Sequence, residues 1–165
     1  GRIASLAITD ETGLWVNGII PYTIDLVFTE HERQVIARAM EEFHARTCLR
    51  FVGRQTIQPE PDYIHIKSGT GCSSSVGRQG NKQDLSLKKD GCVYFGIVIH
   101  ELMHAAGFEH EQSRNDRNNY VSINWDNIKG GKSHNFNEVQ SSFACALERW
   151  DCGFPIKQNN KRYCK

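Results

Sequence analysis

The clearest periodic pattern of apolar residues in the chain follows Thr29. Apolar side chains recur there at spacings of three and four residues, which is typical of one face of an α-helix. They are Val35, Ile36, Ala39, Met40 and Phe43. Thr29 and Glu32 have the spacing of a capping box, in which two side chains satisfy amides at the start of a helix. The sequence therefore predicts a helix that begins after Thr29 and places Met40 in the core.

Shorter segments alternate between apolar and polar positions and predict strands. Residues 21–28 and 49–52 have this pattern, before and after the predicted helix. In Tyr63–Lys67, Ile64 and Ile66 share one face, so His65 falls on the other face as a solvated residue. Residues 69–80 are rich in Gly and Ser and predict a loop or an edge strand with turns.

The order of these elements indicates the fold class. A second helix is expected to begin near Cys92, so the order is strand, helix, strands, helix. This order favours an α+β domain with a mixed, mostly antiparallel sheet and two main helices. We expect one domain over residues 1–165. The pattern fades beyond Asn137, where residues 139–150 predict at most a short helix.

Composition and charge narrow the class of protein. The chain has 165 residues with 39% hydrophobic and 24% charged residues, as one globular domain does. A net charge of +1 gives no basic field to attract nucleic acid or acidic lipid. No apolar run approaches the roughly 20 residues that a membrane span requires. We therefore expect neither nucleic acid nor a membrane as a partner.

The cysteines favour an oxidising compartment. There are six, spread along the chain with no CxxC pair: Cys48, Cys72, Cys92, Cys145, Cys152 and Cys164. An even number without metal-binding spacing is typical of three disulfides in a secreted protein. The alternative is six buried thiols in a cytosolic one. The N-terminus has no apolar signal-peptide core, which suits a mature chain or a cytosolic one.

Residues 100–110, HELMHAAGFEH, carry the candidate chemistry. On a helix His100 and His104 lie one turn apart on the same face, so both imidazoles can reach one metal ion. His110 would lie about 9 Å further along the axis if the helix continued. The chain must therefore turn after His104, and Gly107 is the residue that permits the required backbone conformation.

Three neutral imidazoles predict a catalytic zinc site rather than a structural one. They leave a fourth position open for water, whose proton Glu101 could take as the water attacks a carbonyl. A structural site would need a fourth protein ligand. Glu101 is poorly placed for that role, and His134, the remaining candidate, is expected in a surface loop. The pattern thus indicates peptide hydrolysis without a covalent intermediate.

At this point the sequence resembles the astacin family of secreted zinc endopeptidases, in the metzincin clan. HELMHAAGFEHEQSRNDRNNY at 100–120 fills every fixed position of the astacin pattern HExxHxxGxxHExxRxDRxxY. The segments LWVNGIIPYTI at 14–24, TCLRFV at 47–52, GTGCSSSVGR at 69–78 and DGCVYFGIVIHELMHAAGF at 90–108 also resemble astacin segments. The resemblance continues to NFNEV at 135–139, and residues 140–165 are atypical.

The resemblance implies a zincin-like catalytic domain of the metzincin type with an intact upper lobe and a reduced lower lobe. It implies one zinc ion per chain, held by His100, His104 and His110, with Glu101 as the general base. It also implies that Glu111 contacts the buried start of the mature chain, near residues 7–8.

The family pattern carries further expectations. It pairs Cys72 with Cys92 and Cys48 with a cysteine near the C-terminus, for which Cys164 is the candidate, and this leaves Cys145 and Cys152 as the third bridge. An edge strand near residues 72–76 should bind an extended peptide as an added strand. This chain has serines at 73–75, where relatives often carry aromatic residues. Four further residues match the pattern and are expected to lock a turn: Arg114, Asp116, Arg117 and Tyr120.

The largest departure of the sequence from the family is an absence. Metzincins place a methionine-containing turn beneath the zinc, and astacins follow it with a tyrosine that can ligate the metal. Here both methionines, Met40 and Met103, precede His110. Because the three histidines and the glutamate of the motif are all present, we expect a secreted zinc endopeptidase that cleaves extended polypeptides. The alternative is a truncated, catalytically impaired zinc-binding chain that acts as a decoy or binding module.

Overall fold

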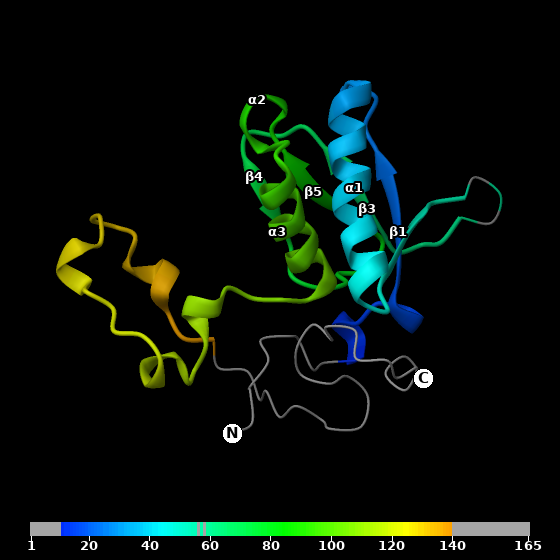
Figure 1. The fold of residues 1–165 in the computed structure, drawn as a ribbon. Helices are drawn as coiled ribbons and strands as arrows, with labels where there is room; N and C mark the ends of the chain where they lie inside the picture. Colours follow the sequence, from blue (N-terminus) through cyan, green and yellow to red (C-terminus); the bar gives the residue numbers. More distant parts are fainter. Residues whose placement is uncertain (1–10, 56, 58, 140–165) are drawn as a thin grey trace.

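The described residues form a single five-stranded sheet with two long α-helices, which pack beside each other, and one short α-helix (Figure 1). The structure is a computed structural model that describes residues 11–55, 57 and 59–139. The strands are β1 (Ile19–Ile24), β2 (Arg50–Gly53), β3 (Tyr63–Lys67), β4 (Cys72–Ser74) and β5 (Lys82–Leu87). Their order across the sheet is β2-β1-β3-β5-β4, which leaves β4 at one edge.

The direction of the strands corrects one expectation. The sheet is mixed, as predicted, but the prediction of mostly antiparallel pairs is wrong. β1 runs parallel to β2 and β3, and β3 runs parallel to β5. Only β4 and β5, joined by a short loop, pair in antiparallel fashion within the described part of the chain. For β1 and β2 the reason is that α1 (Glu30–Arg46) crosses from the end of β1 to the start of β2, so the chain enters the sheet again in the same direction.

The predicted helix after Thr29 is confirmed. The Thr29 hydroxyl accepts a hydrogen bond from the Glu32 amide, and the Glu32 carboxylate accepts one from the Thr29 amide. This reciprocal pair is the expected capping box. Met40 is buried on the core face of α1. Ile36, Ala39 and Phe43 are buried with it.

Two strand predictions need correction at their ends, and one strand was not predicted. The strand predicted at 21–28 is β1, which ends at Ile24 because Asp25 begins a turn and its side chain accepts the Val27 amide. The strand predicted at 49–52 is shifted by one residue. Tyr63–Lys67 forms β3 as predicted. β5 was missed because Gln83, a polar residue, occupies one of its buried positions.

The helix that carries the histidine motif lies against the sheet and against α1. It is α3 (Phe95–Ala106), which starts after the short helix α2 (Lys89–Cys92) and so slightly later than predicted. α3 contacts α1, β4 and β5. The core between helices and sheet contains Ile20, Ile64, Ile66, Leu85 and Leu87 from the strands and Val98, Leu102 and Ala105 from α3.

The predicted disulfide between Cys72 and Cys92 is confirmed and ties the edge strand β4 to α2. Cys48 is disulfide-bonded as well. Cys145, Cys152 and Cys164 lie outside the described residues, so the remaining predicted pairings stay predictions. The short helix predicted at 139–150 also falls outside them, apart from its first residue.

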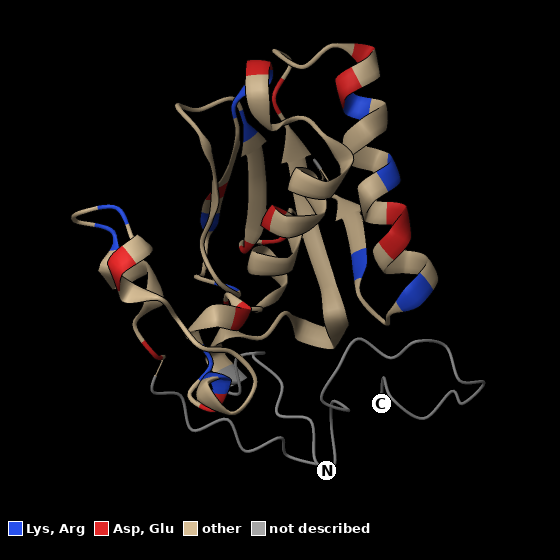
Figure 2. Cartoon of the chain, turned by 60° about the vertical axis from the view of Figure 1, so that its left-hand side comes forward, with Lys and Arg blue, Asp and Glu red and all other residues tan. Residues whose placement is uncertain are grey.

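After α3 the chain leaves the sheet and runs to residue 139 through four short 3-10 helices (Figure 1). They are Glu111–Ser113, Arg117–Asn119, Trp125–Asn127 and Ser133–Phe136. Figure 2 shows both acidic and basic residues along α1 and along this segment. Within the described part of the chain, no helix combines the length and the apolar character that crossing a membrane requires.

Candidate metal centre

Two of the three predicted ligands project from consecutive turns of α3. The Nε2 atoms of His100 and His104 lie 3.0 Å apart. This is the consequence of a four-residue spacing on a regular helix, which stacks two side chains on one face. His104 is buried, whereas His100 is exposed.

The third predicted ligand, His110, reaches the same place because the chain turns at Gly107. This residue has φ 110° and ψ 18°, a left-handed conformation that glycine adopts without steric cost. The Gly107 amide donates to the His104 carbonyl, and the Phe108 amide donates to the Met103 carbonyl. Together these two bonds form a Schellman motif that ends α3. The Nε2 atom of His110 then lies 3.2 Å from that of His104.

The arrangement of the three imidazoles fits a single metal ion. Their candidate ligand atoms all lie within 4.8 Å of one another. A tetrahedral ion with Zn–N bonds of about 2.0–2.1 Å separates its ligand nitrogens by about 3.3 Å. The two measured separations of 3.0 and 3.2 Å are close to this value. Because His100 and His110 are exposed, the centre is open to solvent on one side.

Hydrogen bonding and local charge favour the form of the rings that binds metal. The Nδ1 atom of His104 lies 2.7 Å from the Phe108 carbonyl oxygen. A carbonyl only accepts, so Nδ1 carries the proton and Nε2 keeps its lone pair. Partial desolvation, together with the neighbouring His104 and His100 rings, lowers the pKa of His110. A neutral imidazole is the ligating form.

Glu101 lies next to this cluster and is the only charged residue of α3. Its side chain is buried, and its Oε2 atom has no hydrogen-bond partner among the described residues. Burial raises the pKa of Glu101, while the nearby imidazoles of His100 and His104 act in the opposite direction. A buried carboxyl with an unsatisfied oxygen fits a site that binds water and a metal ion, because such a group is costly to leave unpaired.

The other histidines do not join the cluster. His65, on β3, contacts the Thr23 hydroxyl, and its ring is half-buried rather than fully solvated. His134 is exposed, as predicted, but it lies in the 3-10 helix Ser133–Phe136 rather than in a loop. Within the described ranges, only His100, His104 and His110 form a group that could hold a metal ion.

Comparison with known proteins decides the family. The family model named Astacin, which describes a peptidase family, matches residues 7–153 and so includes all three predicted ligands. The chain belongs to the astacin family. The match also extends past residue 139, where the recognised astacin segments end.

Two curated astacin relatives and one solved structure illustrate the similarity. The chain is 48% identical over 125 residues to zinc metalloproteinase nas-8 of Steinernema carpocapsae, covering 76% of this chain and 29% of the relative. It is 48% identical over 120 residues to high choriolytic enzyme 1 of Oryzias latipes, covering 73% of this chain and 43% of the relative. The chain thus spans less than half the length of these relatives.

The solved structure is that of high choriolytic enzyme 1, a hatching enzyme zinc-protease from Oryzias latipes. It matches with a TM-score of 0.74 at 36% identity, covering 97% of this chain and 84% of that one. The zincin-like α+β fold predicted from the sequence is therefore confirmed.

The astacin residues that follow His110 lock a turn, as predicted. The Arg114 guanidinium donates to both carboxylate oxygens of Asp116, over 2.7 and 2.9 Å. These hydrogen bonds lower the pKa of Asp116. Arg114 also lies over the Tyr120 ring, 5.7 Å from its centroid, and pairs with the exposed Glu111. The expected contact of Glu111 with the mature N-terminus involves residues outside the described part of the chain.

Arg117 has the larger structural role in this segment. Its side chain is buried and donates to the carbonyls of Gln112 and Phe136. It thereby joins the first and the last of the four 3-10 helices that follow α3. The first of them directly follows His110. The pattern pointed to a structural role for Arg117, and these contacts confirm it.

Sequence reasoning missed two contacts at the end of α3. The indole Nε1 of Trp15 donates to the Ala105 carbonyl over 2.7 Å. The amide of Gly77 donates to the His104 carbonyl over 2.8 Å. Both residues lie in segments that resemble astacin, but no spacing within the chain indicates that they meet α3.

Proposed function

We propose that this protein is a secreted zinc-dependent endopeptidase in which His100, His104 and His110 hold one zinc ion and Glu101 is the general base. The observation that supports this most strongly is the convergence of three imidazole nitrogens beside a buried carboxyl. Three protein ligands rather than four are typical of a catalytic zinc site. The family membership and the zinc metalloproteinase relatives support the same conclusion.

The histidines bind and orient the metal. Each presents Nε2, and the hydrogen bond of His104 to the Phe108 carbonyl fixes the orientation of the central ring. When bound, zinc polarises a carbonyl oxygen and lowers the pKa of a coordinated water to about 7. The exposure of His100 and His110 leaves room for a substrate to approach.

Glu101 moves the proton. Its carboxylate takes a proton from the attacking water and gives it to the amine that leaves the cleaved peptide bond. A carboxyl whose pKa is raised toward the working pH performs both transfers better than an ordinary one. Burial of the Glu101 side chain supplies this shift.

The substrate is proposed to be an extended polypeptide that pairs with β4. This strand is the edge of the sheet and contacts α3, so a peptide added to it would pass the metal centre. Ser73 on β4 is exposed, and a small hydroxyl side chain there would favour a substrate that needs no deep pocket.

Secretion is supported by the disulfide chemistry. The structure contains the Cys72–Cys92 disulfide. Disulfides persist in oxidising compartments and are rare in the cytosol. The alternative function, a zinc-binding decoy, is not favoured, because the named relatives are zinc proteinases and choriolytic enzymes.

Digestion of casein or gelatin by the purified protein tests this proposal. We expect cleavage that a zinc chelator abolishes and that Glu101→Gln reduces by about 10²–10⁴-fold without loss of bound zinc. Glu41→Gln, a change at an exposed position of α1, is the matched control and should cleave normally. A protein that holds one zinc ion per chain and cleaves nothing would contradict the proposal and support the decoy.

A further inference from the structure

The last turn of α3 is held by donors from outside the helix. The final carbonyls of a helix lack partners within it and must be satisfied by other groups. Here the His104 carbonyl accepts from Gly77, in addition to Gly107, and the Ala105 carbonyl accepts from the Trp15 indole. The backbone position of His104 therefore depends on two segments that are distant in sequence.

Arg78 fastens these two segments together. Its own amide donates to the Gly13 carbonyl over 2.7 Å. Its guanidinium donates to the carbonyl of Leu14 over 2.9 Å and to that of Thr12 over 2.7 Å. Arg78 directly follows Gly77, and Leu14 directly precedes Trp15. The three bonds thus fix the two groups that donate to α3, the Gly77 amide and the Trp15 indole, relative to each other.

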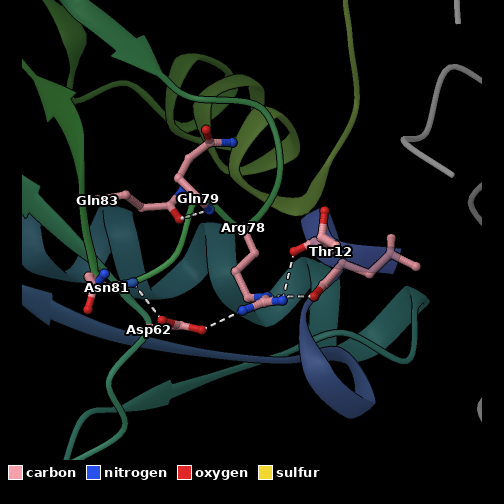
Figure 3. Close-up of polar contacts among 7 residues, drawn as sticks. Thr12, Asp62, Arg78, Gln79, Asn81 and Gln83 are labelled. Carbon is pink, nitrogen blue, oxygen red and sulfur yellow. Dashed lines mark hydrogen bonds and ion pairs between the residues drawn. The ribbon is translucent and has the colours of Figure 1, made fainter. Parts of the chain in front are cut away.

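Asp62 fixes the arginine in turn (Figure 3). One Oδ atom accepts from Arg78 over 2.5 Å, and the other accepts the Asn81 amide over 2.5 Å. The guanidinium lies between the Asp62 carboxylate and the backbone of Thr12. An arginine donates several bonds in a rigid planar fork, which a lysine cannot reproduce.

A buried glutamine supports the same loop from the inside. The side-chain oxygen of Gln83 accepts the Gln79 amide, and its nitrogen donates to the Gly77 carbonyl over 2.9 Å. Gly77 has φ 72°, a conformation that favours glycine. The loop that presents the Gly77 amide to His104 is therefore held on both sides, by Arg78 and by Gln83.

We propose that Arg78 is a positioning residue for the metal centre, which holds the last turn of α3 so that His104 stays aligned with His110. This proposal rests on the proposed zinc site. The hydrogen bonds that Arg78 donates within the described part of the chain go to Thr12, Gly13, Leu14 and Asp62 and to none of the three histidines, so it acts through the donors of Gly77 and Trp15. Substitution of groups that orient metal ligands typically weakens metal binding 10–100-fold.

The test compares Arg78→Lys with Arg33→Lys. Arg33 is a matched control, because its guanidinium also donates to two backbone carbonyls, those of Phe28 and Asp25, but at the start of α1. Zinc-loaded proteins are mixed with excess chelator, and the rate of zinc loss is followed. We expect roughly tenfold faster loss from Arg78→Lys and an unchanged rate from Arg33→Lys. Trp15→Phe, which removes one donor to α3 and keeps an aromatic ring, should accelerate the loss as well.

Cobalt substitution supplies a second readout that general destabilisation would not move. The visible absorption of bound Co²⁺ should shift in Arg78→Lys and stay unchanged in Arg33→Lys. Equal rates and spectra in wild type and Arg78→Lys would overturn the proposal, as would equal acceleration in both variants. If the two variants differ as expected but the wild-type protein cleaves no peptide, only the proposed function is contradicted. A wild-type protein that binds no zinc would overturn both.

Discussion

The Nε2 atoms of His104 and His110 lie 3.2 Å apart although six residues separate the two histidines. A continuous helix would have separated them by about 9 Å along its axis. The left-handed conformation of Gly107 ends α3 and brings the chain back, so that His110 completes a group begun by His100 and His104. The proposed function therefore depends on a backbone conformation as much as on three side chains.

Gly107→Ala is expected to damage both stability and metal binding. A side chain at φ 110° costs about 1–2 kcal/mol, because Cβ approaches the following carbonyl. Relief of this strain would move His110 away from the other ligands, so zinc affinity should fall as well. Denaturant unfolding and zinc titration measure the two effects.

Gly96→Ala is the matched control for this change. Gly96 also belongs to α3, and apart from its chain neighbours and the backbone of the helix itself, a Cβ there meets no atom within 4 Å. Alanine should therefore stabilise the protein by up to about 1 kcal/mol and leave zinc affinity unchanged. If Gly107→Ala bound zinc as tightly as Gly96→Ala, the turn at Gly107 would not be required for the site.

Thr29→Ala tests the capping box at the start of α1. The change removes the acceptor of the Glu32 amide and should lower the free energy of unfolding by about 1 kcal/mol. The rate of zinc loss should not change, since α1 carries no ligand. Thr70→Ala, at an exposed position in a bend, should be neutral. Equal unfolding free energies for the two variants would argue against a stabilising cap.

Asp62→Asn should change how stability responds to acid. The hydrogen bonds from the Asn81 amide and Arg78 lower the pKa of Asp62 in the folded protein. The carboxylate therefore stabilises the fold above the pKa of the unfolded chain, about 3.9, and this contribution disappears as pH falls through the folded pKa. Wild type should exceed the variant in unfolding free energy at pH 6–7, and the difference should shrink below about pH 4.

Unfolding by denaturant across this pH range provides the measurement. A difference between wild type and Asp62→Asn that stays constant from neutral to strongly acidic pH would contradict the role of the Asp62 charge. It would also weaken the case that Asp62 holds the Arg78 guanidinium in place.

The parts of the site that the sequence predicted are local. The capping box of Thr29 and Glu32, the pairing of His100 with His104 and the turn at Gly107 each depend on residues within about two helical turns, where spacing determines geometry. The candidate metal-binding group could therefore be recognised from residues 100–110, and its astacin context from the longer segments.

The parts that the sequence did not predict depend on side-chain contacts and crossovers that residue spacing does not encode. Gln83 occupies a buried position of β5 because its amide bonds the backbone of Gly77 and Gln79, and a polar residue there obscured the strand. The parallel direction of neighbouring strands follows from crossover connections, which the alternation of apolar and polar residues does not encode. Arg78 and Trp15 are far from α3 in the sequence, so only the folded chain relates them to His104.

X-ray absorption at the zinc edge tests the central claim most directly. We expect one zinc ion per chain with three imidazole nitrogens at about 2.0–2.1 Å and at least one oxygen ligand. His110→Ala should lose one imidazole from this shell, and His134→Ala should leave it unchanged. A protein without stoichiometric zinc, a sulfur ligand at about 2.3 Å, or an unaltered shell in His110→Ala would contradict the account.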